Sequence, residues 1–226
     1  MGVLLSVALF GSVARGDDDV LSDLDVLAIV ENNTGKVEPS TVLAHLPPSL
    51  RSGDPTISWY GAERFRQMSA AGDLFAWHVF LDGRPLYDPS SLFAALGEPA
   101  LYERAADDVD AFLEIATQLP AQLAGAAFNA VYEMGVLYVC LRNVAMSASW
   151  HLADRPDFTR LAPYRLAAQT LPLCVPEEEY RASMLCRMAS QRGLGLPDEI
   201  TADRVLRYHA AAFDWMVAVR ALLDRR

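Results

Sequence analysis

Two strand-like segments enclose a short polar stretch close to the N-terminus of this 226-residue chain. Residues 3–10 form an apolar run that is bounded by Gly11, as expected for a central strand. Residues 23–30, DLDVLAIV, alternate in such a way that Asp23 and Asp25 fall on the same face. This pattern restricts the N-terminal part to a sheet in which a polar segment joins two strands.

Strand signals are confined to the first hundred residues. A third β-rich run at 56–60 is followed by helical segments and by an edge strand at 84–87. The sequence then predicts long helices at 102–119, ending at Pro120, and at 121–150, 160–171, 177–192 and 202–223. We therefore predict an α+β fold, with a mixed β-sheet and flanking helices over residues 1–98 and an all-α helical bundle over residues 99–226.

Charge and composition exclude several classes of protein. The chain has 29 Asp and Glu residues against 19 Lys and Arg residues, a net charge of −10, and no basic tract for general nucleic-acid binding. Its three cysteines match neither a disulfide framework nor a zinc site, which favours a reducing cytoplasm. The run at 3–10 is too short to span a membrane, and the segment 121–150 contains Glu133 and Arg142, so we expect a cytoplasmic protein without membrane contact.

The candidate phosphate-binding and metal-binding residues lie in and just after the turn between the first two strands. Gly11 allows the backbone to approach a ligand closely, and Ser12 brings a hydroxyl to free N–H groups, which suits a phosphate. Asp23 and Asp25 point to the same side about 7 Å apart by strand geometry. Two carboxylates so placed can hold hard cations such as Mg²⁺, which bridge to substrate phosphates.

This constellation resembles the signature of the DNA polymerase β-type nucleotidyltransferase superfamily, a Gly-Ser pair, ten intervening residues and Asp-x-Asp. The string GSVARG…SDLDVLAIV is especially similar to the small bacterial members, and SWYGAERF…LDGRPLYD extends the resemblance over residues 3–98. The resemblance implies that Gly11 and Ser12 hold the β- and γ-phosphates of ATP or another NTP. It also implies that Asp23 and Asp25 bind two Mg²⁺ ions.

The implied activity is Mg²⁺-dependent transfer of a nucleoside monophosphate to a hydroxyl. By the resemblance, the nucleotide is AMP from ATP, and the acceptor is an aminoglycoside-like small molecule or a protein side chain. The surplus of acidic groups near the site favours the metal ions and attracts a cationic acceptor. We place the active site between the sheet domain and the bundle, because acceptor pockets commonly form at domain interfaces.

The sequence departs from the family pattern in two places. Family members place a third carboxylate on the next strand, where the predicted register puts Thr56. Asp54 has the same parity and reaches the site if the strand begins early or bulges. The other candidate, Glu63, is expected to cap the first turn of its helix. Family members also carry a helix before the first strand, for which residues 1–2 leave no room, so either the chain begins late or a neighbouring element covers that sheet face.

Several alternatives stay open at this point. Arg15 either contacts the triphosphate or neutralises the acidic residues 17–19. The whole protein is alternatively a catalytically weakened antitoxin or partner-binding module of a nucleotidyltransferase–HEPN type system, because the third carboxylate is displaced. Arg204 and His209 have the Arg-x4-His spacing of HEPN ribonucleases, a pair that also arises by chance in an Arg-rich helix. We expect His78 to be a packed helix residue.

Overall fold

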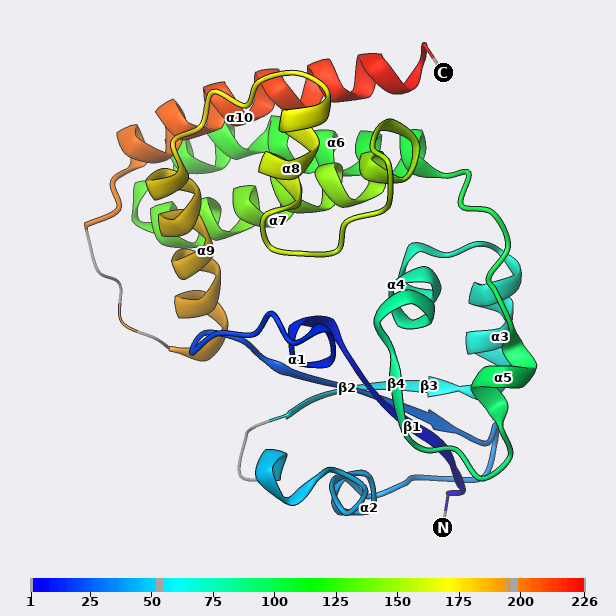
Figure 1. Cartoon of the computed structure of the whole chain (residues 1–226). Helices are drawn as coiled ribbons and strands as arrows, with labels where there is room; N and C mark the ends of the chain where they lie inside the picture. Colours follow the sequence, from blue (N-terminus) through cyan, green and yellow to red (C-terminus); the bar gives the residue numbers. More distant parts are fainter. Residues whose placement is uncertain (1, 52–54, 194, 196–198, 226) are drawn as a thin grey trace. The chain divides into compact units, whose positions relative to one another are not determined.

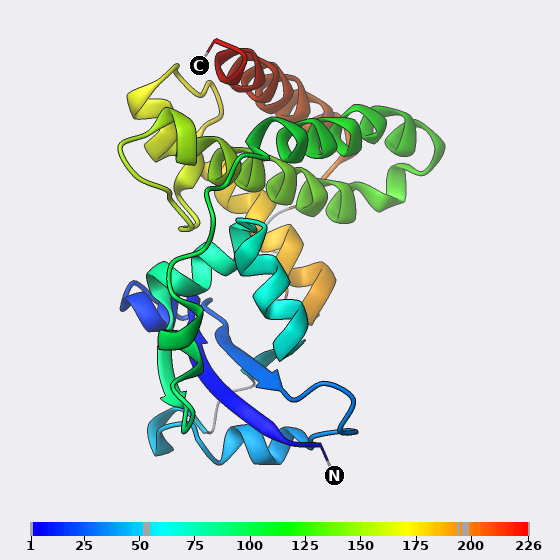
Figure 2. The ribbon, with the colours of Figure 1, turned by 90° about the vertical axis from the view of Figure 1, so that its right-hand side faces the viewer.

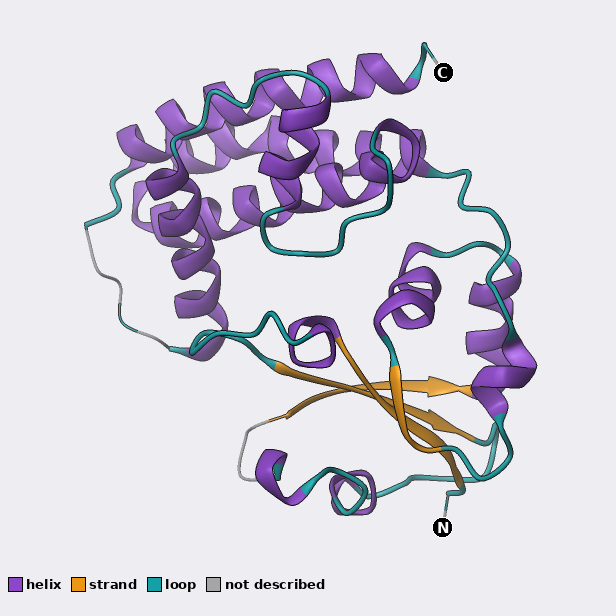
Figure 3. Cartoon of the chain, viewed as in Figure 1, coloured by secondary structure: helices purple, strands orange, loops and turns teal. Residues whose placement is uncertain are grey.

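The computed structural model describes residues 2–51, 55–193, 195 and 199–225. The chain divides into two compact units, Met1–Glu103 and Arg104–Arg226. Within the described ranges, strands occur only in the first unit and the second unit is helical (Figure 3). The α+β fold class is therefore confirmed, whereas the proposed domain division after residue 98 stays a prediction.

The first unit contains a four-stranded mixed sheet in the order β3-β2-β1-β4 (Figure 1). Strand β1 (Leu4–Phe10) pairs antiparallel with β2 (Leu24–Val30) and with β4 (Arg84–Tyr87). Strand β2 pairs parallel with β3 (Pro55–Gly61). The strands coincide closely with the predicted segments, and Asp23 immediately precedes β2 instead of opening it.

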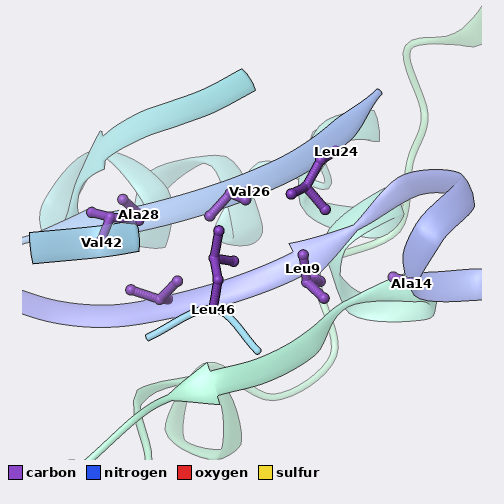
Figure 4. Close-up of a cluster of buried hydrophobic side chains, with 8 residues drawn as sticks. Leu9, Ala14, Leu24, Val26, Ala28, Val42 and Leu46 are labelled. Atoms are coloured by element: carbon purple, nitrogen blue, oxygen red, sulfur yellow. The ribbon is translucent and has the colours of Figure 1, made fainter. Parts of the chain in front are cut away.

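One face of the sheet packs on α2 (Pro39–Leu43), on η1 (Pro48–Leu50) and on the segment between them. Figure 4 shows Val26 and Leu46 pointing toward each other in this core. The buried cluster comprises Val7, Leu9, Ala14, Leu24, Val26, Ala28, Val42 and Leu46. Helix α2, which the sequence analysis did not predict, is thus a neighbouring element that covers this sheet face.

The opposite face of the sheet packs on α3 (Ala62–Ala70), α4 (Leu74–Asp82) and α5 (Leu92–Leu96), and Figure 2 shows α3 and α4 on the other side of the strands from α2. The core on this side comprises Phe10, Leu27, Ile29, Ala62, Phe65, Val79 and Leu92. Asp25 has the same strand parity as Leu27 and therefore belongs to the α3–α4 side of the sheet.

Helix α7 (Ala130–Leu152) is central to the second unit and follows the short η2 (Ala127–Asn129). It packs against α6 (Ala105–Gly125), α8 (Ala162–Gln169), α9 (Glu177–Arg192) and α10 (Ala202–Leu223). Because it buries residues all around its circumference, its apolar character reflects packing inside the unit. In the described part of the chain, no helix combines the length and the apolar composition that crossing a bilayer requires.

Helix α6 continues through Pro120, so the predicted helix end at this proline is wrong, and the predicted segment 121–150 is divided between α6 and α7. A proline inside a helix offers no N–H to the carbonyl four residues earlier, which here is that of Ala116. His209 Nε2 of α10 donates to this buried oxygen at 2.8 Å. A side chain from another helix therefore satisfies the acceptor that Pro120 leaves open, and the helix continues.

We predict that His209→Phe lowers the free energy of unfolding by about 1–3 kcal/mol, because the buried Ala116 carbonyl loses its donor. The new ring still stacks on Phe213, as the imidazole does. Pro120→Ala restores a backbone N–H, so the double variant recovers most of the loss. Urea denaturation of the four chains measures this coupling, and an equal loss from His209→Phe in both backgrounds contradicts the assignment.

Candidate active site

The turn after β1 is a single helical turn between two glycines. Helix α1 (Gly11–Arg15) begins directly after Phe10, and Gly11 has φ +72°, a left-handed conformation that favours glycine. The helix ends at Arg15 and is capped by Gly16, and the N–H groups of Gly16 and Asp17 both donate to the Ser12 carbonyl, at 2.8 and 3.2 Å. These two bonds close the turn that carries the predicted phosphate-binding pair.

Asp25 lies directly against this turn. The antiparallel register pairs Phe10 with Asp25, so Gly11, the first residue after β1, lies next to the Asp25 carboxylate. A Cβ atom on Gly11 would lie 2.5 Å from Asp25 Oδ2, far closer than side chains approach one another. Gly11 therefore allows both the left-handed turn and the close approach of the carboxylate. The structure places Gly11, which Ser12 follows in the chain, beside Asp25, and the assignment of these residues to one site stays a prediction.

Asp23 and Asp25 are both half-buried. They stand two positions apart at the start of β2, a spacing of about 7 Å in extended backbone. The Oδ1 atom of Asp23 is buried and accepts no hydrogen bond from the described residues, although Asp23 makes other interactions. Carboxylate oxygens in this setting fit a hard divalent cation such as Mg²⁺.

The third carboxylate is not found at the register position where the family has one. Strand β3 pairs Asp25 with Thr56, an exposed residue whose hydroxyl carries no charge. Asp54, the predicted alternative, lies outside the described residues. Glu63 lies in the first turn of α3, where no side-chain cap hydrogen bond is made, and it accepts a hydrogen bond from Gln67. Over the described ranges, no group of three or more His, Cys, Asp or Glu side chains is placed to hold a metal ion.

Arg15 ends α1 and contacts two carboxylates. Its Nε atom donates to both oxygens of Asp17 at 3.2 Å, and its Nη1 atom donates to Asp82 Oδ2 at 2.7 Å. His78 Nε2 lies 3.1 Å from the same Asp82 oxygen, and its ring meets the Phe10 ring edge-on. Sequence reasoning missed Asp82, because the spacing to His78 indicates only a helical pair and nothing links either residue to Arg15.

The Arg15–Asp82 pair is charged at neutral pH. Burial alone would raise the pKa of the Asp82 carboxyl, but hydrogen bonds from His78 and Arg15 outweigh burial and hold this pKa below its usual value. Burial also opposes the charge on Arg15, yet its bonds to Asp82 and Asp17 raise the pKa of the guanidinium. The stabilisation from Asp82 is complete above the ordinary aspartate pKa and is lost as the pH falls through the lowered value.

The Arg-x4-His pair of the second unit has structural contacts. Arg204 Nε donates to Glu179 at 3.0 Å, which joins α10 to α9. His209 donates to the Ala116 carbonyl that Pro120 leaves open. Arg204 and His209 therefore both make contacts that join neighbouring helices.

A comparison with protein families finds a match to the N-terminal segment. Residues 3–57 match the family model described as "Nucleotidyltransferase domain", which covers 55 of the 226 residues and includes Gly11, Ser12, Asp23 and Asp25. The match confirms the predicted resemblance over this part of the chain and supports transfer of a nucleoside monophosphate as the general activity. No curated protein matches the chain.

We predict that Gly11→Ala and Gly16→Ala each lower the free energy of unfolding by about 1–2 kcal/mol, because both glycines have a left-handed backbone. Only Gly11→Ala also displaces Asp25, since a Cβ on Gly16 meets nothing within 4 Å. Mn²⁺ titration followed by electron paramagnetic resonance should therefore show weaker binding by about tenfold or more for Gly11→Ala alone. Equal Mn²⁺ affinities in the two variants would contradict the role given to the Gly11–Asp25 contact.

Proposed function

We propose that the first unit transfers a nucleoside monophosphate, AMP from ATP, onto a hydroxyl group in a Mg²⁺-dependent reaction. The observation that carries this proposal is the contact between the Gly11–Ser12 turn and the Asp25 carboxylate, which the register of β1 and β2 brings together. The nucleotidyltransferase match over residues 3–57 supports the same reaction class.

In this proposal the turn binds the β- and γ-phosphates of the nucleotide through the Ser12 hydroxyl and nearby backbone N–H groups. Asp23 and Asp25 hold two Mg²⁺ ions, and Asp54 is the candidate for the third carboxylate. When bound, the ions supply positive charge that offsets the triphosphate and lowers the pKa of the acceptor hydroxyl. Gly11 leaves the space that Asp25 occupies, so the carboxylate stays beside the phosphate-binding turn.

The charge of the N-terminal region supports a cationic acceptor. Residues 1–99 carry 13 acidic and 6 basic side chains, so the field near the site attracts metal ions and positively charged molecules. An aminoglycoside-like compound presents both hydroxyl and ammonium groups, and a protein side chain is the second acceptor class. We place the reaction in the cytoplasm, because all three cysteines are free thiols.

Thr56 motivates a second candidate function. A hydroxyl at the register position opposite Asp25 weakens the metal site if Asp54 supplies no ligand. The chain would then be a catalytically weakened antitoxin or partner-binding module. This candidate retains nucleotide or partner binding and lacks turnover, which separates it from the enzyme in a single assay.

Binding of ATP to the full chain with and without Mg²⁺, followed by pyrophosphate release with aminoglycosides and protein acceptors, tests the proposal. We predict Mg²⁺-dependent ATP binding and a fall in pyrophosphate release of at least about 100-fold in Asp25→Asn, because this variant removes a ligand charge. Asp18→Asn is the matched control, since Asp18 is exposed in the acidic loop and has no assigned role.

Equal activity in Asp25→Asn and Asp18→Asn would overturn the assignment of Asp25 as a metal ligand. Metal-dependent ATP binding with tight partner binding, but without pyrophosphate release for any acceptor, would favour the weakened module. Neither binding nor release in the unmodified chain would contradict both candidates.

A further inference from the structure

Helix α4 contacts the chain on both sides of the Gly11–Ser12 turn. Before the turn, the His78 ring packs edge-on against the Phe10 ring at a centroid distance of 5.5 Å. After the turn, Asp82 Oδ2 accepts a hydrogen bond from Arg15 Nη1 at 2.7 Å. His78 and Asp82 are four residues apart on α4 and lie 3.1 Å from each other, so one helix turn of α4 makes both contacts.

From this arrangement we infer that Asp82 is a positioning residue, which holds Arg15 and thereby keeps the phosphate-binding turn against Asp25. The inference rests on the proposed function and extends it to a residue outside the segment that matches the nucleotidyltransferase domain. In this role Asp82 acts through its hydrogen bond from Arg15 and requires no contact with nucleotide or metal.

The turn needs such a contact because its own helix is too short to hold its shape. Helix α1 has five residues and no side-chain cap, and a helix of this length is not stable by itself in water. Gly11 contributes no side chain, Ala14 is buried in the core that contains Leu24, and Val13 packs partly buried against the same core. The ion pair of Arg15 with Asp82 adds a directional contact at the other end of the helix.

The surroundings of this ion pair make it stronger than a surface pair. The side chains of Arg15 and Asp82 are 19% and 14% exposed, so solvent screens their attraction only partly. His78 Nε2 lies 3.1 Å from the same Asp82 oxygen and 3.4 Å from Arg15 Nη1, so the imidazole borders both members of the pair. The Arg15–Asp82 contact therefore links two elements that are 67 positions apart in sequence.

The same contacts argue against a direct phosphate contact by Arg15. Its guanidinium donates to Asp17 and to Asp82, so one positive charge is surrounded by two negative charges. Arg15, Asp17 and Asp82 together carry one net negative charge, which weakens the attraction between a polyphosphate and the guanidinium. An anchor for α1 is the role that the geometry favours.

The effect of Asp82→Asn on nucleotide affinity distinguishes an anchoring role of Arg15 from a direct phosphate contact. Binding weakens if Arg15 anchors α1, and it is unchanged or tighter if Arg15 contacts the phosphates. We predict that Asp82→Asn weakens Mg²⁺-dependent ATP binding to the full chain by about tenfold, as loss of a positioning contact typically does. Arg15→Lys keeps the charge and recovers part of the affinity that Arg15→Met loses. Isothermal titration well below the melting temperature gives the dissociation constants, and circular dichroism checks the fold.

Asp157→Asn is the matched control for this experiment. Asp157 is 13% exposed and pairs with Arg165 in the second unit, so its substitution removes an equally shielded charge from a different unit. Unchanged or tighter ATP binding in Asp82→Asn, together with a loss in Arg15→Met, would show that Arg15 contacts the phosphates directly and would overturn the inference.

A second measurement keeps the inference testable if the unmodified chain binds no nucleotide, the result that contradicts the proposed function. Amide exchange at Gly16 and Asp17 reports on their bonds to the Ser12 carbonyl in the ligand-free chain. Faster exchange at these amides in Asp82→Asn than in Asp157→Asn supports the anchor, and equal exchange in the two variants overturns it.

Discussion

The site depends on the antiparallel pairing of β1 with β2, which places Phe10 opposite Asp25. A slip of one residue would turn Asp25 to the α2 side of the sheet and separate it from Gly11. Such a slip is costly because both faces of β2 are buried, with Val26 packed on one side and Leu27 on the other. The apolar cores therefore fix the position of a carboxylate that neither core contains.

In two places a polar group at a break in regular structure forms its hydrogen bond with a side chain that is distant in sequence. Pro120 leaves the Ala116 carbonyl without its helical donor, and His209 supplies one from α10. Arg15 ends the single-turn helix α1, and its guanidinium donates a hydrogen bond to Asp82, which lies on α4. In both cases a short-range break in regular structure is tolerated because a tertiary hydrogen bond compensates for it.

The main residues of the candidate site can be predicted from the sequence because they lie close together along the chain. Gly11, Ser12, Asp23 and Asp25 lie within fifteen residues and are joined by two strands with clear patterns. The helix through Pro120 was mispredicted because the compensating donor, His209, is 93 positions from the carbonyl it serves. Asp82 was missed for the same reason, since only the packing of α4 against α1 reveals its contact with Arg15.

In the proposed site, Asp23 and Asp25 bind divalent cations beside a turn that holds a polyphosphate. Anomalous scattering from a crystal soaked with Mn²⁺ and a non-hydrolysable ATP analogue tests it most directly. We expect a Mn²⁺ peak within coordination distance, about 2.0–2.4 Å, of carboxylate oxygens of both residues, with the analogue's phosphates at Gly11 and Ser12. An ordered analogue bound elsewhere, with no Mn²⁺ at either aspartate, would contradict it.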